Sequence, residues 1–239
     1  MSSAWYNDDE NAPEVLSGWF IHKMDKSFLS SFVDDCFSEK EEKSEQDEPF
    51  DRASVERIIN NTLIKFENEK TTDTPFRFRL ARESDVEAIC QLIQAIADFE
   101  NVPNAVELSR DDIIRDGFSD NPIFYCILLD YVEENGEIKN NCGMIFFYFG
   151  YTMGTGRYIY MAELFVKEGY RRKGGGELCL KLLSGITLAT DCTELTWIAY
   201  DWNALALGFY KKMGAKIDDD MTLVKYGAEG LVPVSNFAK

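Results

Sequence analysis

The sequence predicts an α+β protein in which a mixed, mostly antiparallel sheet carries helices on both faces. Three observations lead to this prediction. Two segments with helical spacing come first, residues 123–149 then read as two strands joined by a short turn, and the last third alternates between strand and helix. Short strand–turn–strand units pair antiparallel, whereas strand–helix–strand units bring parallel neighbours, so the sheet is expected to be mixed.

The chain is long enough for one domain with an appendage. It has 239 residues, of which 45% are hydrophobic. Residues 1–75 hold 18 acidic and 8 basic side chains, whereas the remaining residues hold 24 and 17. We therefore expect an acidic N-terminal extension over residues 1–74, partly disordered or helical, and a globular domain over residues 75–239.

Within the extension, residues 38–51 have almost no apolar side chain, which predicts disorder or a linker. Amphipathic segments flank this run. Residues 15–37 are rich in aromatic side chains, and residues 54–66 have apolar side chains at helical spacing behind Ser54, a plausible N-cap. These segments are expected to dock on the domain or to bind a partner.

The first half of the domain shows strand alternation, then helical spacing behind capping residues, then a meander. The expected elements are a strand over 76–80, a helix entered at 82–85 and ending at Phe99, a helix over 111–118 capped by Ser109, a strand over 123–132, a turn over 133–137 and a strand over 142–149.

The second half begins with a glycine-rich turn. The expected elements are this turn over 152–156, a strand over 159–166, a basic glycine loop over 171–176, a helix with Leu178, Leu182, Leu183 and Ile186 on one face, a strand over 195–200, a helix over 204–213 stopped by Gly214, and a final hairpin over 216–226.

Several function classes are excluded or disfavoured by composition. The only histidine, His22, lies outside the apparent catalytic region, which argues against a serine–histidine triad, a histidine general base and a His-based metal site; we expect no metal. A net charge of −17 argues against nucleic-acid and membrane partners. Six scattered cysteines and the lack of a membrane-length apolar run favour a cytoplasmic protein.

The basic glycine loop is suited to phosphate. Arg171, Arg172 and Lys173 precede Gly174, Gly175 and Gly176 between a predicted strand and a predicted helix. Glycines let the backbone approach a ligand, the N–H groups of a first helical turn point outward, and the helix dipole favours an anion. A glycine triplet alone more often marks a flexible turn that carries solvated charges.

Further motifs give this loop a specific context. Arg171-x-x-Gly174-x-Gly176 resembles the R/Q-x-x-G-x-G/A loop of the GNAT superfamily of N-acetyltransferases, which grips the pyrophosphate of acetyl-CoA. Residues 92–100 (LIQAIADFE), 116–122 (DGFSDNP), 201–203 (DWN) and 209–211 (FYK) resemble the diamine (spermidine/spermine-type) and thialysine acetyltransferases. The resemblance covers residues 76–226 and implies a GNAT-like sheet with a splayed central strand pair.

The resemblance also implies the cofactor site. Backbone groups of Leu164, Phe165 and Val166 would pair with the pantetheine arm, and a backbone N–H there would polarise the thioester carbonyl. The loop site would comprise Arg171, Arg172, Lys173, Gly174, Gly175, Gly176 and Glu177, with the amides from Arg172 onward holding the pyrophosphate. Asn203 would contact the cofactor, and Tyr210 would lie near its sulfur.

The chemistry of acetyl transfer asks for an acid and a base. A tyrosine with a pKa of about 10 is a suitable acid for a thiolate with a pKa of about 8.5, which favours Tyr210. Glu163, a carboxylate inside an apolar strand, is the candidate base and substrate-binding group, and Glu100 is a second substrate-binding candidate. The alternatives are a core tyrosine for Tyr210 and an ordinary helix-end charge for Glu100.

The chain departs from the diamine acetyltransferases on the amine side. Ala162 stands where they carry a second acid, Gly154 lies near the place of an aromatic ring, and Phe99 replaces a frequent tyrosine. These departures favour an amine other than a long polyamine.

We therefore expect direct acetyl transfer from acetyl-CoA to a small cationic amine, a diamine, polyamine or thialysine-like amino acid, in a ternary complex. The resemblance also implies a homodimer built partly through the C-terminal strands. Two alternatives stay open: an acetyl-CoA-binding interaction protein with a degenerate amine site, and a protein lysine or N-terminal acetyltransferase.

Overall fold

The computed structural model describes residues 14–15, 19–34, 37, 50–69, 74–218 and 224–225. The chain divides into two compact units. Residues 24–197 form the larger one, called here the main unit, and residues 1–23 with 198–239 form the other, called the terminal unit. In the part of the chain that the structure describes, no helix has the length and apolar character needed to cross a membrane.

The main unit is built on a mixed sheet in which β3, β4, β5, β6 and β7 are neighbours in that order. Their bounds are β3 (Phe76–Leu80), β4 (Tyr125–Val132), β5 (Ile138–Thr152), β6 (Gly156–Val166) and β7 (Glu194–Tyr200), the last three residues of β7 belonging to the terminal unit. The first four strands pair antiparallel, and β7 pairs with β6 in parallel. The α+β class and the mostly antiparallel sheet are confirmed.

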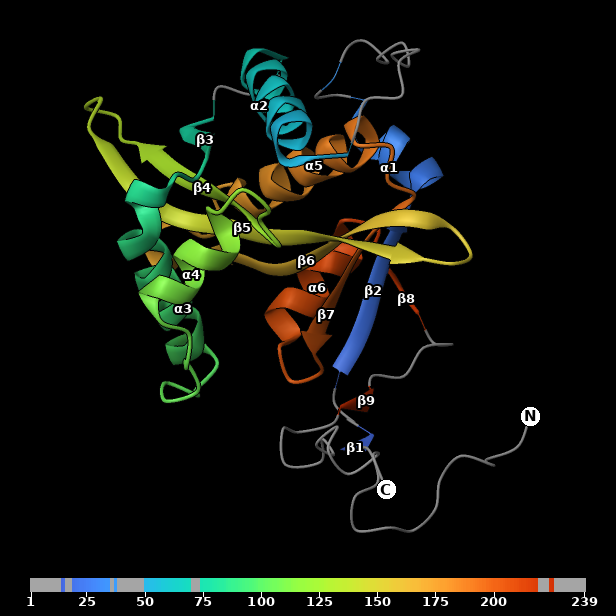
Figure 1. The fold of residues 1–239 in the computed structure, drawn as a ribbon. Helices are drawn as coiled ribbons and strands as arrows, with labels where there is room; N and C mark the ends of the chain where they lie inside the picture. The colour runs from blue at the N-terminus through green and yellow to red at the C-terminus, as the bar shows by residue number, and fades with distance from the viewer. Residues whose placement is uncertain are drawn as a thin grey trace. The chain divides into compact units, whose positions relative to one another are not determined.

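One face of this sheet is covered by α3 (Val86–Phe99) and α4 (Arg110–Gly117), which follow the 3₁₀ turn η1 (Glu83–Asp85) (Figure 1). Apolar side chains of the two helices form one cluster with Leu128, Met144 and Phe165 of the strands. Ser109 caps α4 as predicted, since its Oγ accepts a hydrogen bond from the N–H of Asp112 at 3.1 Å.

The opposite face is covered by α5 (Gly175–Ala189), which contacts α1 (Lys26–Phe32) and α2 (Arg52–Glu69) of the extension (Figure 1). Every residue from Leu178 to Thr187 except Lys181 is buried, so α5 is enclosed on nearly all sides. At Gly185 an added Cβ would lie 2.4 Å from the ring of Phe37, so the extension approaches the backbone of this helix closely.

The start of α2 differs from the prediction. The helix begins at Arg52, and Asp51 caps it by accepting a hydrogen bond from the N–H of Ser54 at 2.9 Å. The N-cap assigned to Ser54 was wrong, because Asp51 three residues earlier offers an equally good acceptor and adds one turn to the helix.

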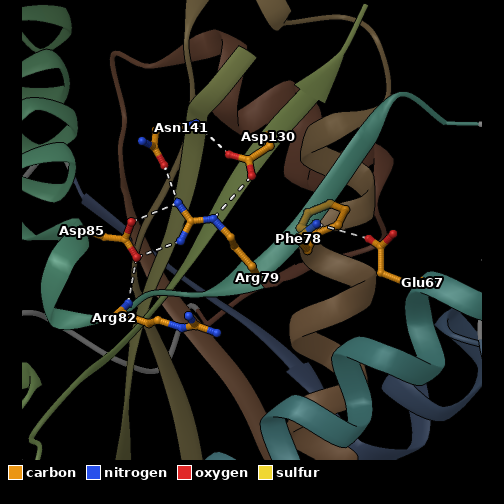
Figure 2. Close-up of polar contacts among 7 residues, drawn as sticks. All are labelled: Glu67, Phe78, Arg79, Arg82, Asp85, Asp130 and Asn141. Carbon is orange, nitrogen blue, oxygen red and sulfur yellow. Dashed lines mark hydrogen bonds and ion pairs between the residues drawn. The ribbon is translucent and has the colours of Figure 1, made fainter. Parts of the chain in front are cut away.

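A polar network around Arg79 joins β3 to the start of α3 (Figure 2). Its guanidinium donates to Asp85 at 2.7 and 3.0 Å, to Asn141 at 3.0 Å and to Asp130 at 3.4 Å. Asp85 also accepts the N–H of Arg82 at 2.9 Å. Two-pronged arginine–carboxylate bonds fix orientation as well as distance, so this network sets the direction in which α3 leaves the sheet.

The terminal unit contains β1 (Glu14–Val15), most of β2 (Trp19–Asp25), α6 (Ala204–Lys212), β8 (Lys216–Ile217) and β9 (Val224–Lys225). β8 pairs with β2 and β9 pairs with β1, both antiparallel. The hairpin predicted over residues 216–226 is therefore wrong. Strand pattern and turn residues indicated two strands, but their partners are N-terminal segments about 200 residues away, which a local pattern cannot reveal.

Candidate active site

β6 and β7 form only a short ladder. Their paired residues in the main unit are Ile159 with Leu195 and Tyr160 with Thr196. β6 continues six residues beyond Tyr160, to Val166, and over this stretch it stays paired with β5 on its other edge. Leu164, Phe165 and Val166 thus lie on a strand whose β7 side has no partner in the described part of the main unit.

A β-bulge lies where the ladder between β5 and β6 passes Ala162. Phe146 pairs with Glu163 and Phe147 pairs with Met161, so Ala162 has no residue opposite it. Residues directly paired in a sheet share a face, and Phe146 packs against the α3–α4 cluster. The bulge therefore turns the Glu163 side chain toward the face covered by α3.

Glu163 faces a second carboxylate there. Burial and, after it, the charge of Glu100 raise the pKa of Glu163 to about 7. Burial also raises the pKa of Glu100, which is the C-cap of α3. In the described part of the chain neither carboxylate has a cationic partner within 4 Å. Two acids beside the negative end of a helix form a place suited to a cation.

The loop after β6 presents backbone N–H groups. It follows the 3₁₀ turn η2 (Glu168–Tyr170) and carries two residues with positive φ, Arg172 at 60° and Gly174 at 88°. Gly174 is the N-cap of α5. Among the described residues, no hydrogen bond satisfies the N–H groups of Gly175, Gly176 and Glu177. Free N–H groups at a helix N-terminus are a set of hydrogen-bond donors that suits a phosphate or pyrophosphate group.

The loop cations occupy different surroundings. The Nε of Arg171 donates to the carbonyl of Val166 at 2.7 Å, and its guanidinium carbon lies 4.5 Å from the ring centre of Phe99. Lys173 Nζ lies 4.4 Å from the ring centre of Tyr131 and 5.6 Å from that of Tyr170. Arg172 is exposed. Arg171 thus shapes the loop from inside, while the other two cations flank the free N–H groups.

Asn203 and Tyr210 lie in the terminal unit. Asn203 is the N-cap of α6, and its Oδ1 accepts the N–H of Ala206 at 3.1 Å. Tyr210 is buried on α6, with its ring centre 5.4 Å from that of His22 on β2. Burial lowers the pKa of His22, so its imidazole is neutral at neutral pH.

Two features of these surroundings have no local sequence signal. His22 was expected to be remote from the candidate catalytic residues, but it packs against one of them. The contact of Arg171 with Phe99 joins residues 72 positions apart and was not predicted. The described residues contain no group of three or more His, Cys, Asp or Glu that would hold a metal ion.

If this loop is the CoA site expected from the sequence, replacing Gly176 with aspartate should abolish CoA binding while the fold survives. A carboxylate in the first turn of α5 interacts favourably with the helix dipole, so the helix should form, but it repels phosphate. The affinity for CoA should therefore fall by at least about 100-fold. Calorimetric titration with CoA measures the loss. Gly169→Asp is the matched control, because Gly169 is exposed with open space around its Cα. Equal CoA affinity in both variants would remove the loop from the binding site.

Comparison with known proteins gives this arrangement a family context. A thialysine N-epsilon-acetyltransferase of Sus scrofa is 33% identical over 140 residues, which cover 58% of this chain and 82% of the relative. A spermidine/spermine N(1)-acetyltransferase-like protein 1 of Homo sapiens is 34% identical over 141 residues, which cover 59% of this chain and 20% of the relative.

A solved structure shares the fold at lower identity. An integron cassette protein from V. cholerae aligns with a TM-score of 0.54 and 20% identity over 70% of this chain and 99% of its own. The model of the Acetyltransferase (GNAT) family matches residues 88–215, more than half of the sequence. These residues include both candidate carboxylates and the whole glycine loop. The chain therefore belongs to the GNAT family of acetyltransferases.

Proposed function

We propose that this protein is an acetyl-CoA-dependent N-acetyltransferase that transfers acetyl directly to a small cationic amine in a ternary complex. One observation carries the proposal. The half-buried carboxylates Glu163 and Glu100 lie in the same unit as a phosphate-type loop, on and beside the strand whose β7 side beyond Tyr160 has no partner in the described part of that unit. An anion-binding loop and a cation-binding acid pair are the two requirements of a CoA-dependent amine acetyltransferase.

The donor would be held mainly by backbone groups. Acetyl-CoA, when bound, supplies an activated thioester carbonyl. The N–H groups of Gly175, Gly176 and Glu177 would bind its pyrophosphate, and Arg172 and Lys173 would add attraction for its phosphates. The open edge of β6 at Leu164, Phe165 and Val166 would hold the pantetheine arm as a strand partner, and an N–H there would stabilise negative charge on the carbonyl oxygen.

The acceptor would be prepared by the acid pair. An amine arrives as an ammonium ion, which attacks only after it loses a proton. Burial raises the pKa of Glu163 to about 7, which suits a general base at neutral pH, and Glu163 would accept that proton directly or through water. Glu100 would hold positive charge on the substrate while Glu163 is protonated.

Tyr210 is proposed as the acid that protonates the departing thiolate. Tyr210→Phe should lower kcat by about 10²–10⁴-fold, because the ring keeps its packing while the proton donor is lost. CoA affinity should stay within about threefold, since no ring contact is removed. Stopped-flow thiol release and calorimetry measure the two quantities. Unchanged kcat, or unfolding of the variant, would refute this role.

The relatives named for thialysine and for spermidine/spermine support a small amine, and the single acid on β6 beside Ala162 favours the thialysine type. A panel of thialysine, lysine, spermidine, spermine and a lysine-containing peptide, followed by thiol release, tests the proposal. We expect turnover to be highest with thialysine or lysine. CoA binding without turnover of any amine would favour an interaction protein, and a preference for the peptide would favour protein acetylation.

We further propose a cytoplasmic homodimer. The five described cysteines are all free thiols and four of them are buried, as expected in a reducing compartment. The dimer rests on the resemblance to the diamine acetyltransferases, and light scattering of the purified chain tests it.

A further inference from the structure

The side chain of Arg171, the first residue of the loop motif, contacts the end of β6 and the end of α3. Its Nε bonds to the carbonyl of Val166 at the end of β6, at 2.7 Å. Its guanidinium carbon lies 4.5 Å from the ring centre of Phe99 and 5.4 Å from that of Phe165. A planar guanidinium stacks well on aromatic rings, so these contacts hold the side chain between β6 and the end of α3.

Phe99 is the last residue of α3, and Glu100 follows it directly as the C-cap. The Glu100 N–H bonds to the carbonyl of Ile96 at 2.9 Å, so the backbone of Glu100 is fixed to the last turn of the helix. A shift of the last turn of α3, which carries Phe99, would therefore move Glu100 relative to Glu163. In the described part of the chain Arg171 forms no ion pair with either carboxylate, which leaves both for a substrate cation.

We propose that Arg171 is a positioning residue that links the CoA loop to the amine site by holding Phe99, and hence Glu100, in place. This inference rests on the proposed function. Binding of the CoA phosphates to the loop would restrict the motion of Arg171 and, through Phe99, the motion of the end of α3. The amine would then bind more tightly, because Glu100 would already be in place. Because coupling between two binding sites is reciprocal, a bound amine would strengthen the binding of CoA by the same factor.

Lys173 offers a matched control in the same loop. Its ammonium is 3.3 Å from the Tyr131 hydroxyl and packs against the Tyr131 and Tyr170 rings, and among the described residues it forms no hydrogen bond, ion pair or cation–π contact with α3. Lys173→Met should weaken CoA binding through the loss of charge. It should leave the KM for the amine unchanged, which separates loss of a loop cation from loss of positioning.

The kinetic test uses the amine of the panel with the highest kcat/KM. Arg171→Lys keeps the charge but loses the flat stack, and Phe99→Leu loses the ring. Each should raise the amine KM by about 5- to 20-fold with CoA affinity within about threefold, since small displacements of a binding group are costly. Phe99→Tyr, which retains an aromatic ring, should keep the wild-type KM for the amine. The double variant Arg171→Lys/Phe99→Leu should be no worse than either single variant, because both changes break one contact.

A binding measurement tests the link without turnover. CoA is titrated calorimetrically with and without a saturating concentration of the same amine, which forms a dead-end complex. We expect the amine to tighten CoA binding several-fold in the wild-type chain and in Phe99→Tyr, but not in Phe99→Leu.

Failure of this inference can be distinguished from failure of the proposed function. If Arg171→Lys weakens CoA binding tenfold and leaves the amine KM unchanged, Arg171 is a phosphate ligand and the inference is wrong. If Arg171→Lys does not fold, the pair Phe99→Leu and Phe99→Tyr decides, and an unchanged KM in Phe99→Leu overturns the inference. Lack of turnover on every amine would overturn the proposed function, and this inference with it.

Discussion

Glu163→Gln is expected to lower kcat/KM for the amine by about 10²–10⁴-fold, which is the usual contribution of a general base. Glutamine keeps the size of the side chain and its place on β6 but cannot accept the ammonium proton. CoA affinity should stay within about threefold, because the loop is untouched. Steady-state kinetics and calorimetry measure both quantities. Glu168→Gln is the control, since Glu168 is exposed and follows the same strand.

The pH profile gives a second readout of the same variant. With a pKa of about 7, Glu163 should make kcat/KM rise as pH increases through 7 and then level off, after correction for ionisation of the amine. Glu163→Gln should lose this limb. Among the described residues, the titratable groups that interact with Glu163 are Glu100 and Tyr160; burial raises the pKa of Tyr160 to about 12, so Tyr160 stays neutral over this range. If the rise in kcat/KM through pH 7 is unchanged in Glu163→Gln, the general base is a residue other than Glu163.

The raised pKa also predicts a stability effect of definite sign. A carboxyl whose pKa is higher in the folded than in the unfolded state binds its proton more tightly when folded, so the folded state loses stability as pH rises between the two pKa values. From its ordinary value of 4.5, Glu163 shifts to about 7. Glu163→Gln should therefore be more stable than wild type above pH 7, by about 1–3 kcal/mol, and equal to it near pH 4. Thermal melts across this range measure the difference.

Phe66→Ala is expected to lower the free energy of unfolding by about 3–5 kcal/mol. Phe66 is fully buried on α2, with its ring centre 5.6 Å from that of Phe78 on β3 and 5.8 Å from that of Phe37. Truncation leaves a cavity where the extension meets the sheet, and neighbouring side chains fill it only partly. Urea unfolding followed by circular dichroism measures the loss.

Ile64→Ala is the matched control on the same helix. Ile64 is 61% exposed, so its truncation should change the free energy of unfolding by no more than about 0.5 kcal/mol. Deletion of residues 1–69 extends the same argument, because it removes α1 and α2 from the buried surface of α5 and should yield insoluble protein. A soluble, active deletion variant, or equal stability of Phe66→Ala and Ile64→Ala, would show that the extension is not part of the fold.

Local signals in the sequence were sufficient for most helices and strands. Ser109 caps α4, and α6 gives way to Gly214, which has the positive φ of 81° expected of a helix stop. Such features depend on hydrogen bonds and backbone angles within a few residues, and their side-chain preferences are strong. The loop that we propose for phosphate has a local signal of the same kind. Phosphate needs consecutive free N–H groups, which a short glycine motif supplies.

The sequence by itself thus determined the strand–loop–helix unit around Gly174 and the presence of Glu163 within an apolar strand. Tertiary structure alone decided that a bulge at Ala162 turns Glu163 toward Glu100, that Arg171 packs on Phe99, and that β8 and β9 pair with N-terminal strands. Each of these features joins segments far apart in the chain. Such contacts form because surfaces match in the folded state, and they require no residue pattern within any single segment.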